Sequence, residues 1–134
     1  MSLIQTPVSY GELIDKITIL QIKLQQIKDA AKLANVRNEL ELLEATWKND
    51  RASETDIADE TSRLLAVNQR LWKIEDDIRM KERAQAFDDE FIQLARSVYI
   101  ENDERAAIKR EINTKLGSTL VEEKSYQDYR APQA

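Results

Sequence analysis

Six polar residues stand on the packing face of two predicted helices, and their types suit the binding of an anion. Three belong to the predicted third helix and three to the predicted fourth: Asn68, Glu75, Arg79, Asn102, Arg105 and Lys109. Guanidinium and ammonium groups bind carboxylates and phosphates, and a neighbouring amide adds hydrogen bonds. A buried charge is costly without a partner, so these positions need an internal acid or a bound anion beside them. We take the six as candidate ligand-binding residues.

The same residues also have a structural interpretation. One buried asparagine or ion pair in an apolar seam fixes the alignment and oligomeric state of packed helices, at some loss of stability. In an antiparallel pair, Asn68 comes level with Arg105 and Lys109. Asp15 of the first predicted helix can join from the side. Both interpretations stay open here: unpaired Arg79, Arg105 and Lys109 around a pocket would indicate a ligand, whereas an internal acid beside each would indicate structure.

The composition gives little support for catalysis by residues other than these six. The 134 residues include no Cys and no His, which excludes thiolate nucleophiles, sulfur ligands and the usual general base near neutral pH. All-helical pyrophosphohydrolases hold magnesium with acids spaced one helical turn apart, as in Glu101 and Glu104 here, but such pairs often arise on helices by chance. We therefore predict no metal, no cofactor and no catalytic residue.

The overall composition indicates an all-α chain. Only two Gly and two Pro residues leave few turns for a sheet, while 42% hydrophobic and 34% charged residues suit exposed, amphipathic helices. The net charge of −5 argues against a general binder of nucleic acid or anionic membranes. No stretch has the length of a membrane span, and the N-terminus lacks the pattern of a signal peptide. We expect a cytoplasmic protein.

Apolar residues spaced by three and four predict where the helices lie. The prediction is one helical domain over 1–134, with helices at 8–29, 30–49, 54–86 and 88–116 and a tail at 117–134. Capping residues support these ends: Ser9, Asp29, Ser53 and Asp88 at the starts and Gly117 at the last end. A continuous helix through Ala34 is the alternative to a break at Asp29. Phe87 is expected to pack on Ile92 before the fourth helix.

Helices of this length with short connections predict an antiparallel bundle of about four helices. The third and fourth helices form a long hairpin, and the first two form a shorter one against it. The shorter hairpin cannot cover the longer one, which would leave Leu64, Leu65 or Trp72 in water. A partner subunit is the simplest cover, so we expect a homodimer.

Several sequence blocks together resemble one uncharacterised bacterial family, filed as a domain of unknown function. The blocks are VSYGELIDKITIL, LWKIEDDIR, FIQLARSVYIENDERAAIKREIN and EEKSY. The resemblance covers nearly the whole chain, apart from the segment 46–61. It implies a small, stand-alone cytoplasmic protein and supplies no activity.

These observations favour a non-enzymatic, oligomeric helical module that binds a protein partner or an anionic small molecule. The alternative is a small helical enzyme acting on an anionic metabolite. Such an enzyme would be similar to chorismate mutase or to a magnesium-dependent pyrophosphohydrolase. The predicted first helix contains no Arg, in contrast to chorismate-mutase-like enzymes, so no catalytic residue is carried over.

Overall fold

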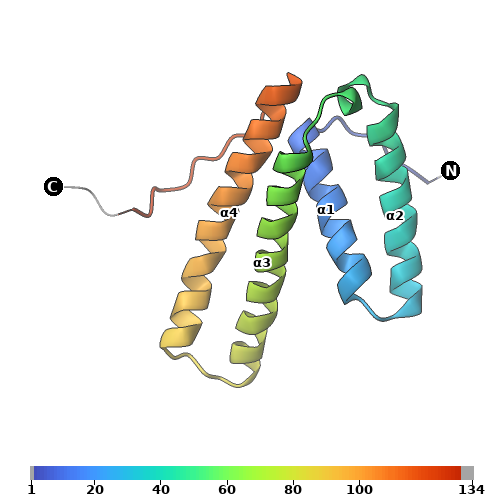
Figure 1. Cartoon of the computed structure of the whole chain (residues 1–134). Helices are drawn as coiled ribbons and strands as arrows, with labels where there is room; N and C mark the ends of the chain where they lie inside the picture. The colour runs from blue at the N-terminus through green and yellow to red at the C-terminus, as the bar shows by residue number, and fades with distance from the viewer. Residues whose placement is uncertain (1, 131–134) are drawn as a thin grey trace.

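The computed structural model describes residues 2–130, which form two antiparallel helical hairpins (Figure 1). The helices are α1 (Tyr10–Gln26), α2 (Ala30–Asn49), α3 (Ala58–Arg83) and α4 (Asp89–Leu116), with a short 3-10 helix, η1 (Arg51–Glu54), between α2 and α3. The predicted all-α bundle with a long α3–α4 hairpin is confirmed. Within the described residues, none of the helices combines the length and the apolar character needed to cross a membrane. Of the predicted tail, residues 131–134 lie outside the described part.

Local capping interactions set most of the helix ends. The side chains of Ser9, Asp29 and Asp88 each accept a hydrogen bond from a backbone N–H in the first turn of α1, α2 and α4. Gly117 ends α4 with a φ of 65°, a left-handed conformation that glycine adopts without strain. These predicted caps are confirmed, and so is the break between α1 and α2. Before α4, the Phe87 ring packs edge-on against Phe91, and the expected packing of Phe87 on Ile92 stays a prediction.

The third helix is shorter than the predicted range 54–86. Ser53 is not its cap: it lies within η1, where its hydroxyl donates to the backbone oxygen of Asp50 at 2.8 Å. Asp56 instead accepts from the backbone N–H of Ala58 at 2.9 Å, just where α3 begins. At the other end, the left-handed φ of 54° at Gln85 turns the chain out of the helix. Asp50 therefore caps η1, whereas Asp56 binds the first N–H of α3, whose N-cap residue is Ile57, so two separate helices stand where the sequence indicated one.

The other bounds differ from the prediction by a few residues. α1 ends before the predicted residue 29, because Ile27 has an extended backbone with a ψ of 136°. It begins at Tyr10 rather than residue 8, since Ser9 is its cap. α4 begins one residue after Asp88 for the same reason.

α1 is the helix that joins the two hairpins. It packs against α2, α3 and α4, whereas α2 packs against α1 and η1. The hydrophobic core follows α1 and consists of Leu13, Ile14, Ile17, Leu20, Val36, Leu40, Ile57, Leu64, Val67, Leu71, Ile108 and Ile112. The two hairpins diverge downward in Figure 1, and the α3–α4 hairpin reaches further. The core therefore lies in the upper part of the α3–α4 hairpin.

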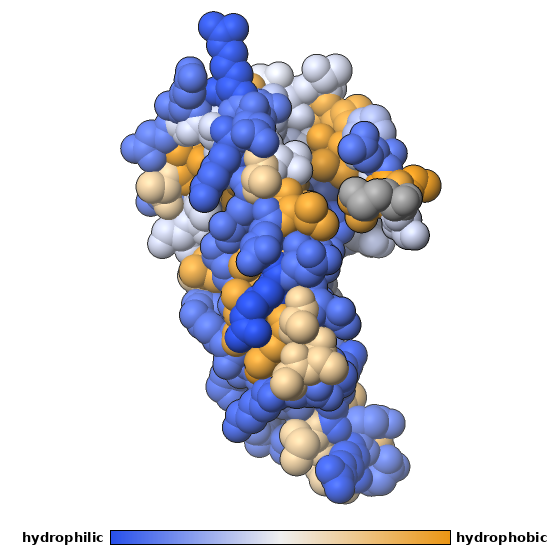
Figure 2. Space-filling view, turned by 90° about the vertical axis from the view of Figure 1, so that its right-hand side faces the viewer, coloured by the Kyte–Doolittle hydropathy of each residue, from blue (hydrophilic) through white to orange (hydrophobic). Residues whose placement is uncertain are grey.

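The rest of this hairpin is a two-helix projection, which we call the distal arm. It comprises residues 72–101, between Leu71 and Asn102, and the structure places no buried residue within it. The arm forms the narrow lower end in Figure 2, where apolar side chains lie between hydrophilic ones. The expectation that Leu64 is exposed is wrong, because α1 covers that level completely. The large apolar residues left exposed on the arm are Met80, Phe87, Ile92, Tyr99 and Ile100.

Candidate functional site

Asp15 lies at the centre of a buried polar network between α1, α3 and α4. Its side chain is only 1% exposed and is bound in two places by Arg105 of α4. Arg105 Nε donates to Oδ1 at 3.0 Å and Nη2 donates to Oδ2 at 2.7 Å. These hydrogen bonds raise the pKa of Arg105 above its ordinary value, although burial acts in the opposite direction. The planar guanidinium matches both carboxylate oxygens, which is the geometry that makes a buried charge tolerable.

Two neutral side chains complete the network. Asn68 of α3 donates through Nδ2 to Asp15 Oδ1 at 2.9 Å and to Thr18 Oγ1 at 2.9 Å. The Thr18 hydroxyl in turn donates to the backbone oxygen of Asp15 at 2.8 Å. Arg105 Nη1 reaches Asn102 Oδ1 at 3.4 Å. Within residues 2–130, no buried side-chain nitrogen or oxygen lacks a hydrogen-bond partner, so the network is complete without an added ligand.

Lys109 lies one turn along α4 from Arg105 and has a different environment. Its side chain is 9% exposed, and its Nζ lies 2.6 Å from Glu12 Oε2 and 2.7 Å from Glu122 Oε2. Burial acts to lower the pKa of Lys109, but the hydrogen bonds to both carboxylates outweigh it and leave the pKa above its ordinary value. Glu12 belongs to the first turn of α1, whereas Glu122 belongs to the segment after α4 that forms neither helix nor strand.

A close backbone approach fixes α1 beside these residues. A Cβ at Gly11 would lie 2.5 Å from the backbone oxygen of Lys109, so only glycine fits between the two helices. The Gly11 N–H also donates to Asn113 Oδ1 at 2.7 Å. This bond satisfies one of the free N–H groups at the start of α1. The approach sets the level at which Glu12 and Asp15 meet α4.

The structure brings together four of the six predicted site residues. Asn68, Asn102, Arg105 and Lys109 lie around the N-terminal half of α1. Glu75 and Arg79 do not join them. These two pair with each other at 3.5 Å on the exposed surface of the arm, beyond Leu71, which is the last buried residue of α3. Each predicted cation therefore meets an internal acid, which supports the structural interpretation for Arg105.

Sequence reasoning left several members of this region out of the six. Asp15 was expected as a neighbour that joins from the side, and Glu12 was not among the six. The three others are Thr18, Asn113 and Glu122. Thr18 could have been found from its place three residues after Asp15 in an otherwise apolar stretch of α1. Glu122 follows no periodicity, so no signal placed it beside Lys109.

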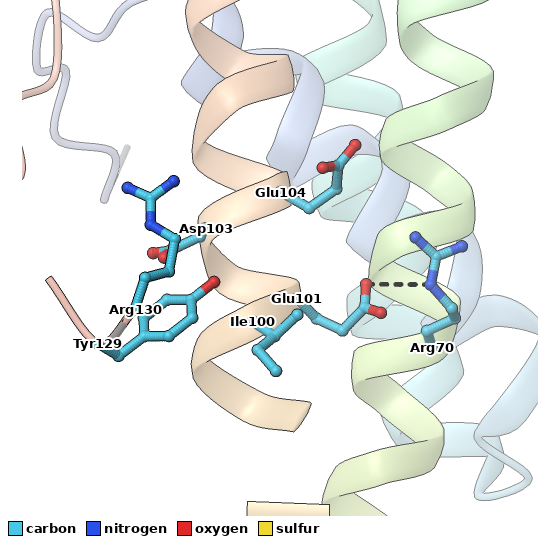
Figure 3. Close-up of a pocket in the computed structure, with 7 residues that line it drawn as sticks. All are labelled: Arg70, Ile100, Glu101, Asp103, Glu104, Tyr129 and Arg130. Carbon is cyan, nitrogen blue, oxygen red and sulfur yellow. Dashed lines mark hydrogen bonds and ion pairs between the residues drawn. The ribbon is translucent and has the colours of Figure 1, made fainter. Parts of the chain in front are cut away.

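Two hollows border this region on the outer side of α4. The larger, of about 1280 Å³, lies between α4 and residues 122–130. The smaller, of about 450 Å³, is shown in Figure 3 and is lined by Arg70, Ile100, Glu101, Asp103, Glu104, Tyr129 and Arg130. In Figure 3 Glu101 points toward Arg70, to which it is bound at 3.0 Å, while Glu104 points away from it. Among residues 2–130, no three Asp or Glu side chains lie close enough together to hold a metal ion.

Comparison with known proteins places the chain in a family. No curated protein and no solved structure matches it. The sequence model of one family covers residues 4–133, which is nearly the whole chain and includes every residue of the network. The chain therefore belongs to the family of unknown function DUF6165.

Proposed function

We propose that the chain is a non-enzymatic helical module whose distal arm binds a basic amphipathic helix of another protein. One observation carries this proposal: none of the side chains of residues 72–101 is buried, although the arm displays five large exposed apolar residues. Helices normally bury their apolar stripe against another element. An arm of two helices lacks that third layer, and a partner helix would supply it.

The charge of the arm favours a basic partner. Residues 72–101 contain eight acidic and five basic residues, a net charge of −3, whereas the whole chain carries −5. A basic amphipathic helix would cover the apolar residues and pair with the surrounding carboxylates. A second copy of the chain would bring two arms of the same sign together, which costs free energy at low ionic strength. Charge therefore favours a different protein over a homodimer.

The proposal can be tested with a synthetic peptide of about 18 residues that carries Leu on one helical face and Lys on the other. We expect the peptide to bind, with NMR shifts in the arm, and a peptide with Glu in place of Lys not to bind. Ile92→Ser should weaken binding about fivefold, since it removes about 1 kcal/mol of apolar burial. Leu42→Ser is the matched control, because Leu42 is similarly exposed but lies on α2, outside the arm.

Two results would contradict this function. If Ile92→Ser and Leu42→Ser weaken binding equally, the arm is not the binding surface. If the chain sediments as a dimer that Ile92→Ser converts to a monomer, a second copy is the partner of the arm instead. Sedimentation velocity at low micromolar concentration makes this distinction.

A further inference from the structure

The two carboxylates that bind Lys109 are held in very different ways. Glu12 is fixed in the first turn of α1, and its side chain is 30% exposed. Glu122 is 60% exposed and lies on a chain segment without regular structure. An exposed side chain on such a segment loses more conformational freedom on binding, and water competes for it. Of the two acids, Glu122 is therefore the one that can be displaced without unfolding the bundle.

The segment that carries Glu122 runs along α4 as a strap, which we define as residues 118–130. It is attached at a few separate points rather than along its length. Besides the Glu122–Lys109 pair, Lys124 forms an ion pair with Asp103. Further along, the Tyr129 ring packs on Tyr99 with 4.9 Å between ring centroids. Leu120 and Val121 remain about half exposed and Tyr126 is almost fully exposed, so apolar burial contributes little to holding the strap.

A groove of about 1280 Å³ lies between the strap and α4. On the α4 side it is lined by Ala95, Val98, Tyr99, Asn102, Asp103, Arg105 and Ala106, with Lys109 at one end. This wall combines an apolar surface with one amide and a few charged groups, of which Arg105 is bound to Asp15 and Asp103 to Lys124 of the strap. Sites for small organic ligands have this composition: a mostly apolar wall with a few polar groups that fix orientation.

We propose that this groove binds an organic anion, whose carboxylate or phosphate pairs with Lys109 and whose aliphatic or aromatic part lies against Val98 and Tyr99. Glu122 marks the place of the ligand's anionic group, since its carboxylate already makes that contact within the chain. Binding exchanges one negative group for another beside Lys109, so the buried ammonium stays neutralised throughout. Arg105 remains with Asp15 and takes no part.

This arrangement also selects among anions. A tethered carboxylate competes at an effective concentration in the millimolar range, so an inorganic ion that offers charge alone cannot displace it at low concentration. An anion with an apolar part gains additional free energy along the α4 wall. The groove should therefore prefer aromatic carboxylates or phosphate esters to inorganic phosphate.

The test compares Glu122→Gln with Glu123→Gln. The two substitutions remove the same charge from adjacent residues, but Glu123 pairs with Arg110 on the surface rather than with Lys109. Benzoate, phenyl phosphate and inorganic phosphate serve as probes in NMR titrations of the full chain. We expect Glu122→Gln to bind the aromatic probes about fivefold more tightly than the unaltered chain, because it removes a competing ion pair of about 1 kcal/mol. Glu123→Gln should bind them like the unaltered chain.

The pattern of shifts and of probes decides the proposal. The expected shifts lie at Val98, Tyr99, Asn102 and Lys109. Tighter binding of benzoate alone identifies the ligand class as carboxylates, and of phenyl phosphate alone as phosphate esters. The proposal is overturned if both Gln variants gain equally, if no probe binds Glu122→Gln at millimolar concentration, or if the shifts lie elsewhere.

Lys109→Gln in the Glu122→Gln background should abolish binding, and its circular dichroism shows whether it folds. If it does not fold, the comparison of Glu122→Gln with Glu123→Gln still decides. Tyr99 belongs to both the arm and the groove, but Ile92→Ser distinguishes the two proposals: Ile92 lies outside the groove lining, so this variant should leave probe binding unchanged.

Discussion

The upper part of the α3–α4 hairpin and the distal arm are built from the same two helices, yet the ion pairs of the two regions differ in burial and in their effect on stability. In the upper part, α1 lies over the hairpin, and the buried Asp15 carboxylate is bound by Arg105, which is partly exposed, and by Asn68. In the arm, the Glu75–Arg79 pair lies on the surface. The third helix makes the difference, because it turns a polar position into a buried one. An ion pair then specifies how three helices align, whereas the surface pair contributes little.

The largest expected difference between the two regions is in the free energy of unfolding after one charged side chain is removed. Arg105→Ala leaves the buried Asp15 carboxylate without its partner, and we expect it to lower the free energy of unfolding by about 3–5 kcal/mol. Arg79→Ala, in the arm, should lower it by less than about 0.5 kcal/mol. Urea unfolding at pH 7 measures both. Equal effects would mean that the Asp15 site is as well solvated as the arm.

The same contrast should hold for apolar residues of one helix. Ile108 is 1% exposed and Ile100 is 44% exposed, two turns apart on α4. Ile108→Ala opens a cavity in the core and should cost about 3 kcal/mol. Ile100→Ala should cost less than about 0.5 kcal/mol. A large loss at Ile100, in a chain shown to be monomeric by sedimentation, would show that the arm is packed in solution.

The contact between α1 and α4 can be tested at its glycine. Gly11→Ala places a Cβ against the backbone of Lys109, and the helices must move apart, at a cost of about 2 kcal/mol. Gly117→Ala is the control, since a Cβ there meets no atom within 4 Å and acts only through its left-handed backbone, at about 1 kcal/mol. Loss of the Asn113 side-chain shift in the NMR spectrum of Gly11→Ala, but not of Gly117→Ala, would identify the displaced contact.

The smallest expected effect concerns acid pH. A hydrogen bond from Lys115 lowers the pKa of Glu60 below its ordinary value. A lowered pKa in the folded state stabilises the fold above the ordinary carboxyl pKa, and this contribution disappears as the pH falls through the lowered value. Lys115→Met should therefore make stability less dependent on pH below about 4.3. Lys23→Met, at a lysine without an ion pair among residues 2–130, should keep the original dependence; identical urea midpoints across this range for all three chains would contradict the assignment.

The helix ends were predictable because the interactions that set them are local. Ser9, Asp29 and Asp88 each bind a backbone N–H only two or three residues away, and such a pattern is visible in the sequence. The failure at Ser53 has a physical cause as well. Asp50 caps η1 and Asp56 binds the first N–H of α3, and the sequence does not indicate which acid turns toward which backbone N–H.

The candidate site was predictable only in part, because its members come from distant segments. Heptad spacing places Asn68 and Glu75 on the same face of α3, yet only Asn68 meets α1. The spacing of residues shows which face of α3 they occupy. It does not show at which residue α1 stops covering that face. The position of Glu122 beside Lys109 could not be predicted for a related reason. A segment without regular structure has no period from which the positions of its side chains could be inferred.

The bond from the Gly11 N–H to Asn113 joins residues 102 positions apart, near the two ends of the chain. The ribosome releases the N-terminus first, so α1 leaves it long before the surface that receives Gly11, Glu12 and Asp15 has been synthesised. Until α4 has been synthesised, α1 can pack only against α2 and α3, and the Asp15 carboxylate lacks the guanidinium that neutralises it. Contacts of such long sequence separation are late and slow to form. The fold can therefore be completed only after Arg105 and Asn113 have been synthesised, and a chain cut short before Arg105 leaves Asp15 without its charged partner.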